Sequence, residues 1–82
     1  MVLEIYTPEK KVFEGQVEEA TFPGSKGTFQ VLNNHAALIS TLEKGKVVYK
    51  NKNEKHVILI NGGVVEVFNN KVILLAEGII ED

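Results

Sequence analysis

Hydrophobic and polar side chains alternate along most of this chain, with a period of two residues instead of the roughly 3.6 of a helix. Leu3 and Ile5 flank Glu4, for example, so the two apolar side chains share one face of an extended segment. This pattern predicts half-buried β-strands. We expect strands at positions 3–5, 12–14, 17–22, 28–32, 46–50, 55–60, 64–68 and 71–76.

Turn-forming residues separate the expected strands. Pro23-Gly24-Ser25-Lys26-Gly27 is the strongest loop signal, and Gly15 is expected to break the chain between two strands. Asn51-Lys52-Asn53 predicts a hairpin loop. Asn69-Asn70 suits a two-residue type I′ turn, because asparagine tolerates positive φ better than most residues.

The segment 36–42 is ambiguous, because its two alanines favour a helix whereas Ile39 and Thr41 are β-branched. We interpret it as a short turn followed by a strand. About eight or nine short strands with turns at close spacing are typical of a sandwich or a barrel. No linker, repeat or low-complexity segment interrupts the pattern, so we predict one all-β domain over residues 1–82.

The composition restricts the classes of function. A net charge of −2, with nine basic residues scattered along the chain, leaves no basic surface for a phosphate backbone, so we expect no nucleic-acid partner. The absence of cysteine excludes disulfides and thiolate-bound zinc. The apolar runs 57–60 and 72–76 are far shorter than the about 20 residues that span a bilayer, and residues 1–4 lack the features of a secretion signal. Any membrane association is therefore expected to occur through a partner.

The reactive side chains do not form a recognisable catalytic motif. Ser40, His35 and Glu43 could be drawn as a triad, but such a set occurs by chance in most chains of this length. The loop Gly24-Ser25-Lys26-Gly27 lacks the spacing, the hydroxyl residue after the lysine and the following helix of a phosphate-binding loop. His56 is expected to be a partly buried or cross-strand-paired side chain. We predict no catalytic residue, no cofactor site and no metal site.

Two adjacent pairs have a structural interpretation. Glu18 and Glu19 would point to opposite faces of a strand, so they cannot share a proton as a catalytic dyad. Gly62-Gly63 opens an expected strand, and predicts either a β-bulge or a close approach between backbones.

One long motif resembles a known family. The run Phe22-Pro23-Gly24-Ser25-Lys26-Gly27-Thr28-Phe29-Gln30-Val31-Leu32-Asn33-Asn34-His35-Ala36-Ala37-Leu38 is similar to the epsilon subunit of F-type ATP synthases. That family reads Pro-Gly, a spacer, and Gly-x-Phe-Gly-Val-Leu-Pro-Gly-His-Ala-Pro-Leu. The resemblance is collinear over essentially the whole chain, and it includes Leu3 to Pro8, Val12 to Gly15, Leu42 with Gly45, Asn61 to Val67, Asn70 to Val72 and Leu75 to Glu77.

The sequence departs from the family pattern at a few positions. Gln30 replaces a glycine, Asn33-Asn34 replaces Pro-Gly before the histidine, and Ala37 replaces a proline. Asn34 can take the left-handed conformation that glycine would otherwise supply. Thr28 stands where relatives often have an acidic residue, so a charge pair with the partner there is either missing or supplied by Lys26.

The resemblance implies a fold and a function. The fold would be a two-layer β-sandwich of about eight to ten short, mostly antiparallel strands. The function would be that of a non-catalytic rotor subunit in the central stalk, which links the gamma subunit to the membrane c-ring and couples proton or sodium transport to ATP synthesis. By position, Thr7, His35 and Ser40 would contact the gamma subunit, and Ser25, Lys26, Gly27 and Thr28 would contact the c-ring.

The same resemblance carries three further expectations. The protein would lie peripherally on the cytoplasmic face of a bacterial inner membrane, as part of the synthase. Since the sequence stops at Asp82, the carboxy-terminal helical hairpin that inhibits ATP hydrolysis in many relatives would be missing, and we interpret this as a native short form that binds no nucleotide. Phe13, Phe29 and Val31 are candidates for an apolar patch that faces a partner. The alternative interpretation is a free-standing β-sandwich that binds a peptide or a sugar.

Overall fold

A computed structural model describes residues 1–80, and these form ten β-strands and no helix. The all-β prediction is therefore confirmed. The strands are β1 (Val2–Tyr6), β2 (Lys11–Gln16), β3 (Glu19–Gly24), β4 (Gly27–Leu32), β5 (Leu38–Leu42), β6 (Gly45–Asn51), β7 (Glu54–Ile60), β8 (Gly63–Phe68), β9 (Lys71–Ala76) and β10 (Ile79–Ile80).

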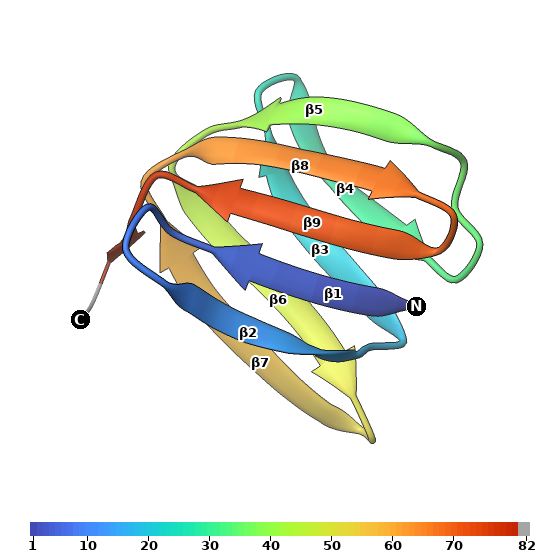
Figure 1. Cartoon of the computed structure of the whole chain (residues 1–82). Coiled ribbons are helices and arrows are strands. Elements are labelled where there is room, and N and C mark those ends of the chain that lie inside the picture. The colour runs from blue at the N-terminus through green and yellow to red at the C-terminus, as the bar shows by residue number, and fades with distance from the viewer. Residues whose placement is uncertain (81–82) are drawn as a thin grey trace.

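The strands form one continuous hydrogen-bonded sheet that folds over into two layers (Figure 1). The first layer has the order β2-β1-β9-β8-β5, and the second has the order β4-β3-β6-β7-β10. The layers join at a corner where Gly24 of β3 pairs with Leu42 of β5. All strand pairs are antiparallel except β1 with β9. The predicted two-layer sandwich is confirmed.

The core lies between the layers and consists of the inward side chains of both. Leu3 and Ile5 are fully buried, as their alternation with Glu4 predicts. The packing includes an aromatic pair, since the rings of Phe22 and Phe29 lie 5.7 Å apart between centroids. The largest fully buried side chains are those of Phe22, Leu3, Ile5, Ile60, Leu74, Val31, Val47, Val65, Val67 and Val72.

Asparagine-rich turns close two hairpins. Asn69 and Asn70 have φ angles of 50° and 61°, which confirms the type I′ prediction. The loop between β6 and β7 is one residue shorter than predicted: Asn51 still belongs to β6, and Lys52 and Asn53 alone form the turn, with φ angles of 49° and 67°. The structure also confirms a left-handed Asn34, with φ of 61°. In the ambiguous segment 36–42, the expected strand is present as β5, but the turn lies earlier, at Asn33-Asn34, and residues 36–37 are irregular.

Two predicted boundaries are wrong in the first part of the chain. Gly15 does not interrupt the chain, because it pairs with Leu3 inside β2 and the ring of Phe13 packs over it. The strand expected at 17–22 begins only at Glu19. Val17 lies outside both strands and Glu18 forms a bend, because the nitrogen of Val17 donates a hydrogen bond to the carbonyl of Met1 and its side chain is buried in the core.

The glycine-rich loop 23–27 is also shorter than predicted. Pro23 pairs with Thr28 and Gly24 pairs with Gly27, so β3 and β4 continue almost to the tip of the hairpin. Gly63 confirms a close backbone approach at the start of β8, since a Cβ atom there would lie 2.3 Å from the carbonyl oxygen of Leu75. Within residues 1–80, no helix is long and apolar enough to cross a membrane.

Candidate functional site: loops and an apolar sheet face

The three residues predicted to contact the gamma subunit do not gather at one point. Thr7 follows β1 and closes a turn, in which its nitrogen donates a hydrogen bond of 2.9 Å to the carbonyl of Lys10. His35 precedes β5 at the opposite end of the first layer, because β1 and β5 run in the same direction. Ser40 lies in the middle of β5 and is half-buried. The three residues thus span the first layer from one end to the other.

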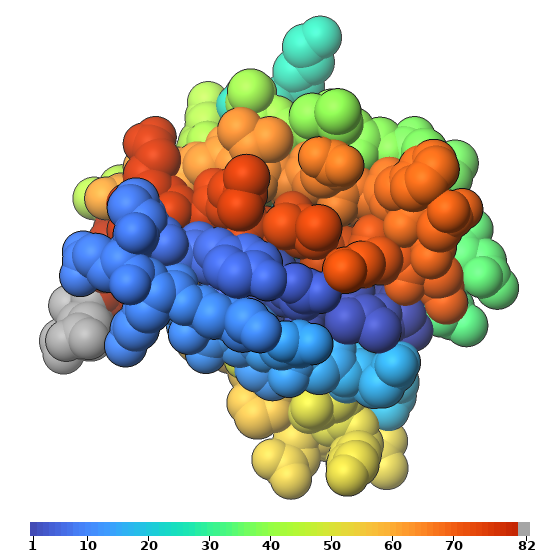
Figure 2. Space-filling model, in the orientation of Figure 1, coloured from blue at the N-terminus to red at the C-terminus, as the bar shows by residue number. Residues whose placement is uncertain are grey.

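The four residues predicted to contact the c-ring form the exposed tip of the β3–β4 hairpin. Ser25, Lys26, Gly27 and Thr28 are all exposed. This hairpin protrudes at the top of the molecule in Figure 2. Gly27 has a φ of 124°, a conformation that favours glycine, and this allows Ser25 and Lys26 to form a two-residue turn.

A groove of about 550 Å³ connects the hairpin tip to β5. It is lined by the segment Gly24 to Phe29 and by Ile39, Ser40 and Thr41. Ser40 therefore lies beside the predicted c-ring residues, as well as on the strand that borders the first layer. Ser40, which was predicted to contact the gamma subunit, thus lines the same groove as the four residues predicted to contact the c-ring.

The outward face of the first layer carries a cluster of apolar side chains that the sequence did not reveal. Ile39 of β5, Phe68 of β8 and Leu75 of β9 are 73%, 60% and 53% exposed. Val64 pairs with Leu75 across the β8–β9 ladder, and both Val64 and Ile73 are half-buried. We call Ile39, Val64, Phe68, Ile73 and Leu75 the outer patch. Figure 2 shows this face, on which the side chains of β5, β8 and β9 form a continuous surface.

The candidates proposed for such a patch are wrong. Val31 is fully buried, and Phe13 and Phe29 pack against the core. The better signal was the unbroken apolar run 72–76, because a strand with one face in water should alternate. In a mostly antiparallel sheet such as this one, a strand that is apolar on both faces indicates that its outer face is also covered by something.

Glu4 shows a second feature of the outer face that alternation does not predict. Its side chain points away from the core, yet Glu4 is 8% exposed. Tyr6 donates a hydrogen bond from its hydroxyl to one carboxylate oxygen, and Nζ of Lys71 lies 3.0 Å from the other. The hydrogen bond from Tyr6, followed by that from Lys71, lowers the pKa of Glu4, and the same contacts raise the pKa values of Tyr6 and Lys71.

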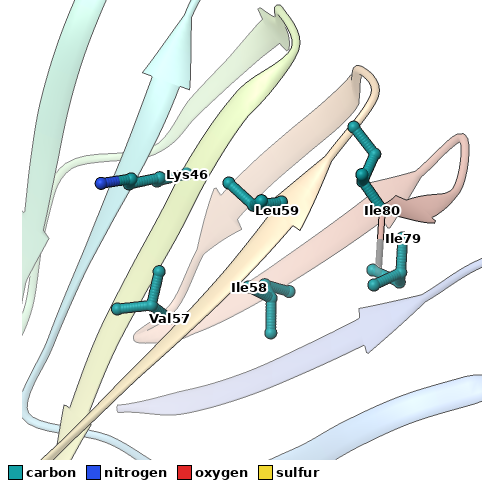
Figure 3. Close-up of a pocket in the computed structure, with 6 residues that line it drawn as sticks. All are labelled: Lys46, Val57, Ile58, Leu59, Ile79 and Ile80. Atoms are coloured by element: carbon teal, nitrogen blue, oxygen red, sulfur yellow. The ribbon is translucent and has the colours of Figure 1, made fainter. Parts of the chain in front are cut away.

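The second layer has a smaller apolar hollow of about 350 Å³, shown in Figure 3. The side chains of Leu59 and Ile80 lie on one side of β7 and β10, and those of Ile58 and Ile79 lie on the other. Lys46 and Val57 complete the lining. Such a surface can bind apolar groups, but among residues 1–80 its lining offers one ammonium group and no carboxylate or imidazole for acid–base chemistry.

The histidines have local structural contacts. His56 stacks on Tyr49 across β6 and β7, with ring centroids 5.1 Å apart, and its Nε2 lies 3.0 Å from Oδ1 of Asn51. The expected cross-strand pairing of His56 is confirmed. Nδ1 of His35 lies within hydrogen-bond distance of the carbonyl oxygen of Ala36, and the hydroxyl group of Ser40 donates a hydrogen bond to the carbonyl of Thr41. Over residues 1–80, no hydrogen bond joins His35 to Ser40, and no group of three metal-binding side chains occurs.

Comparison with known proteins identifies the family. The sequence model of "ATP synthase, Delta/Epsilon chain, beta-sandwich domain" matches residues 1–82. The chain is 44% identical to an ATP synthase epsilon chain of Campylobacter curvus over 77 residues, which cover 93% of this chain and 60% of the relative. The corresponding protein of Sulfurimonas denitrificans is 47% identical over 78 residues, which cover 93% and 59%. The chain therefore spans about three-fifths of the length of these relatives.

Solved structures share the fold. A chain of the Euglena gracilis mitochondrial ATP synthase superimposes with a TM-score of 0.91 at 18% identity, over 98% of this chain and 52% of that one. A chain of the Tetrahymena thermophila mitochondrial ATP synthase, in a structure of its central stalk and c-ring, gives 0.84 at 18% identity, over 98% and 65%. Taken together with the family match over all 82 residues, these likenesses show that the chain belongs to the ATP synthase delta/epsilon family and carries its β-sandwich domain.

Proposed function

We propose that this chain is a non-catalytic subunit of the rotor of an F-type ATP synthase, where it links the gamma subunit to the c-ring. The observation that carries the proposal is the outer patch, in which three large apolar side chains are each more than half exposed. Exposed apolar side chains that lie together on one face mark a surface that a partner covers. Membership of the delta/epsilon family supports a partner within an ATP synthase.

The gamma subunit would cover the first layer. Thr7 and His35 lie at the two ends of this layer, and β5 with Ser40 forms its border, so one broad contact could include all three. A sheet face supports such a contact well, because its side chains are held by cross-bonded strands and lose little freedom on binding. Binding through this face requires no reactive group and no cofactor.

The c-ring would bind the β3–β4 hairpin. The tip Ser25-Lys26-Gly27-Thr28 is exposed, as a contact with the polar loops of another protein requires. Lys26 carries the charge of this tip, and Thr28 carries none, so Lys26 would form any charge pair with the ring. The protein would lie at the cytoplasmic face of a bacterial inner membrane through this partner.

A stiff two-layer sandwich suits the coupling of ion transport to ATP synthesis. The gamma subunit, this domain and the c-ring would turn as one body, driven by protons or sodium ions. Close packing between the layers and hydrogen bonds along every strand resist deformation under such a load.

Mixing the chain with purified gamma subunit tests the proposal. We expect a complex at micromolar concentration by size-exclusion chromatography, and we expect Phe68→Ser to abolish it. Val57→Ser is a matched control, because Val57 is 51% exposed but belongs to the second layer. Absence of a complex with the unaltered chain would overturn the proposal. If Phe68→Ser and Val57→Ser reduced complex formation equally, the outer patch would not be the contact surface.

The c-ring contact has its own test. Lys26→Glu should weaken binding of the domain, in complex with gamma, to detergent-solubilised c-ring, since it reverses the charge of the hairpin tip. Lys52→Glu makes the same change at the tip of the β6–β7 hairpin and should leave binding unaltered. If both variants bind the ring as the unaltered protein does, the hairpin is not the contact.

A further inference from the structure

Glu66 occupies the centre of the outer patch. It lies in the middle of β8, where Ile39 of β5 is its partner on one side and Ile73 of β9 is its partner on the other. Val64 and Phe68 share its face along β8, two residues before and two residues after it. An exposed carboxylate is thus surrounded by four apolar side chains, which are the nearest positions on a sheet face.

The other two acidic side chains on the strands of this face have cations from the same chain. Glu4 is held by Lys71, as well as by the hydroxyl of Tyr6. Glu14 of β2 forms an ion pair with Lys11. Glu66 has no ion pair and no side-chain hydrogen bond to any part of the chain that the structure describes.

Lys71 is the nearest candidate for a cation from this chain. It pairs with Phe68 in the β8–β9 ladder, and so lies diagonally from Glu66. Its ammonium group, however, is 3.0 Å from Oε2 of Glu4, on the side of β9 that faces β1. Within residues 1–80, the carboxylate of Glu66 is therefore left to solvent, and this costs little while the face is exposed.

A partner that covers the outer patch changes this balance. Desolvation of a carboxylate costs several kcal/mol unless a cation or several hydrogen-bond donors replace the lost water. An apolar partner would therefore be opposed at the very centre of the patch. An arginine or lysine on the partner would remove the penalty, and arginine can donate two parallel hydrogen bonds to the carboxylate.

We propose that Glu66 selects its partner: the surface of the gamma subunit that covers the outer patch carries a basic side chain, which pairs with Glu66 inside an apolar ring. The inference rests on the proposed function, since it names the chemistry of the surface that docks there. Glu66 would act as the polar anchor of the contact and fix its register, while the surrounding apolar side chains exclude water from the pair.

Two substitutions at one position test the inference, and both are expected to weaken binding. Glu66→Gln keeps the shape of the side chain but removes its charge, so the basic group on gamma would be buried without a partner. Truncation of one member of such a pair costs about 2–5 kcal/mol, so the affinity for purified gamma should fall by about thirtyfold or more. Glu66→Leu should weaken binding as well, although it makes the patch continuously apolar.

Binding of Glu66→Leu shows whether the Glu66 carboxylate is paired with a basic group on the gamma subunit or contributes nothing to a purely apolar contact. If the contact is purely apolar, leucine at this position extends it, and affinity should rise; tighter or unchanged binding of Glu66→Leu would overturn the inference. Glu14→Gln is the control, because it removes a charge from the same face where Lys11 already compensates it. Melting temperatures of the free variants should match that of the unaltered chain, which shows that binding and not folding has changed.

The same measurements distinguish failure of the inference from failure of the proposed function. If the unaltered chain forms no complex with gamma, both are overturned. If the complex forms and Phe68→Ser abolishes it, while Glu66→Gln binds as tightly as the unaltered chain, the docking face stands and the basic partner of Glu66 is overturned alone.

Discussion

The hydroxyl group of Thr41 donates a hydrogen bond of 2.9 Å to the hydroxyl group of Ser25, across sixteen positions of sequence. The nitrogen of Ser25 also donates to the carbonyl of Thr41, at 3.0 Å. The tip of the β3–β4 hairpin is thus bonded to β5, the strand that contributes Ile39 to the outer patch. The two surfaces proposed for different partners are therefore held in a fixed relation.

Removal of the Thr41 hydroxyl should loosen this connection. Thr41→Val keeps the shape of the side chain but loses the hydrogen bond, which contributes about 0.5–1 kcal/mol at an exposed site. We expect faster hydrogen exchange of the Ser25 amide, with little change in global stability. Thr28→Val on the same hairpin is the control, and an exchange rate that is equal in both variants would show that the hydroxyl pair does not restrain the tip.

Glu4 should make the stability of the fold depend on acid. Because the pKa of Glu4 is lower in the folded chain than its ordinary value of 4.5, the ionised carboxylate stabilises the fold above that value. This contribution is lost as the pH falls from 4.5 through the lower, folded pKa. Glu4→Gln should therefore reduce stability at neutral pH and flatten the decline in acid.

Urea unfolding at neutral pH and in the acid range measures this effect. Glu66→Gln is a suitable control, because Glu66 is exposed and unpaired over residues 1–80. If Glu4→Gln and the unaltered chain lose stability in parallel as the pH falls, the contacts with Tyr6 and Lys71 do not determine the acid response.

Gly63 should tolerate no side chain. A Cβ atom at this position would lie 2.3 Å from the carbonyl oxygen of Leu75, and the φ of 153° is rarely adopted by other residues. We expect Gly63→Ala to cost on the order of 3 kcal/mol, from overpacking together with backbone strain. Gly27→Ala tests strain alone, because a Cβ atom there would meet nothing within 4 Å, and it should cost about 1 kcal/mol.

Thermal unfolding would report both glycine variants. In a domain of this size, 1 kcal/mol corresponds to about 4–8 °C in melting temperature. Equal shifts for the two variants would mean that the backbone at Gly63 relaxes around the added atom.

Two phenylalanines should separate stability from binding. Phe22 is fully buried, so Phe22→Ala removes a core ring and should cost about 3–5 kcal/mol. Phe68 is 60% exposed, and Phe68→Ala should change the free energy of unfolding by less than about 0.5 kcal/mol. Denaturant titration of the two variants checks this; a large loss in Phe68→Ala would indicate that the outer patch stabilises the domain itself.

Local patterns predicted most of the fold. The alternation of apolar and polar residues predicted the inward side chains of β1, and the paired asparagines predicted the turn at Asn69-Asn70. Both features depend on residues that are neighbours along the chain. The failures depend on distant contacts. Val17 leaves the expected strand to bond with Met1, and Gly15 stays in a strand because Leu3 pairs with it.

The candidate site was predictable in part. The exposed loop at Ser25 to Thr28 followed from the motif, whereas its contact with the c-ring stays a prediction. The outer patch did not follow, because the strands that supply Ile39, Phe68 and Leu75 become neighbours only when the sheet forms. The burial of Glu4 could not be predicted from the sequence either, because it depends on Lys71, which lies on a parallel strand far along the chain.

The position of β3 in the sheet determines which parts of the domain a force on its hairpin reaches. It pairs with β4 and β6, and at Gly24 it also pairs with β5 of the other layer. A sideways push on the hairpin tip would therefore reach both layers, the second through the ladder with β6 and the first through the pair of Gly24 with Leu42. A movement of this hairpin would thus be shared by the two faces of the domain.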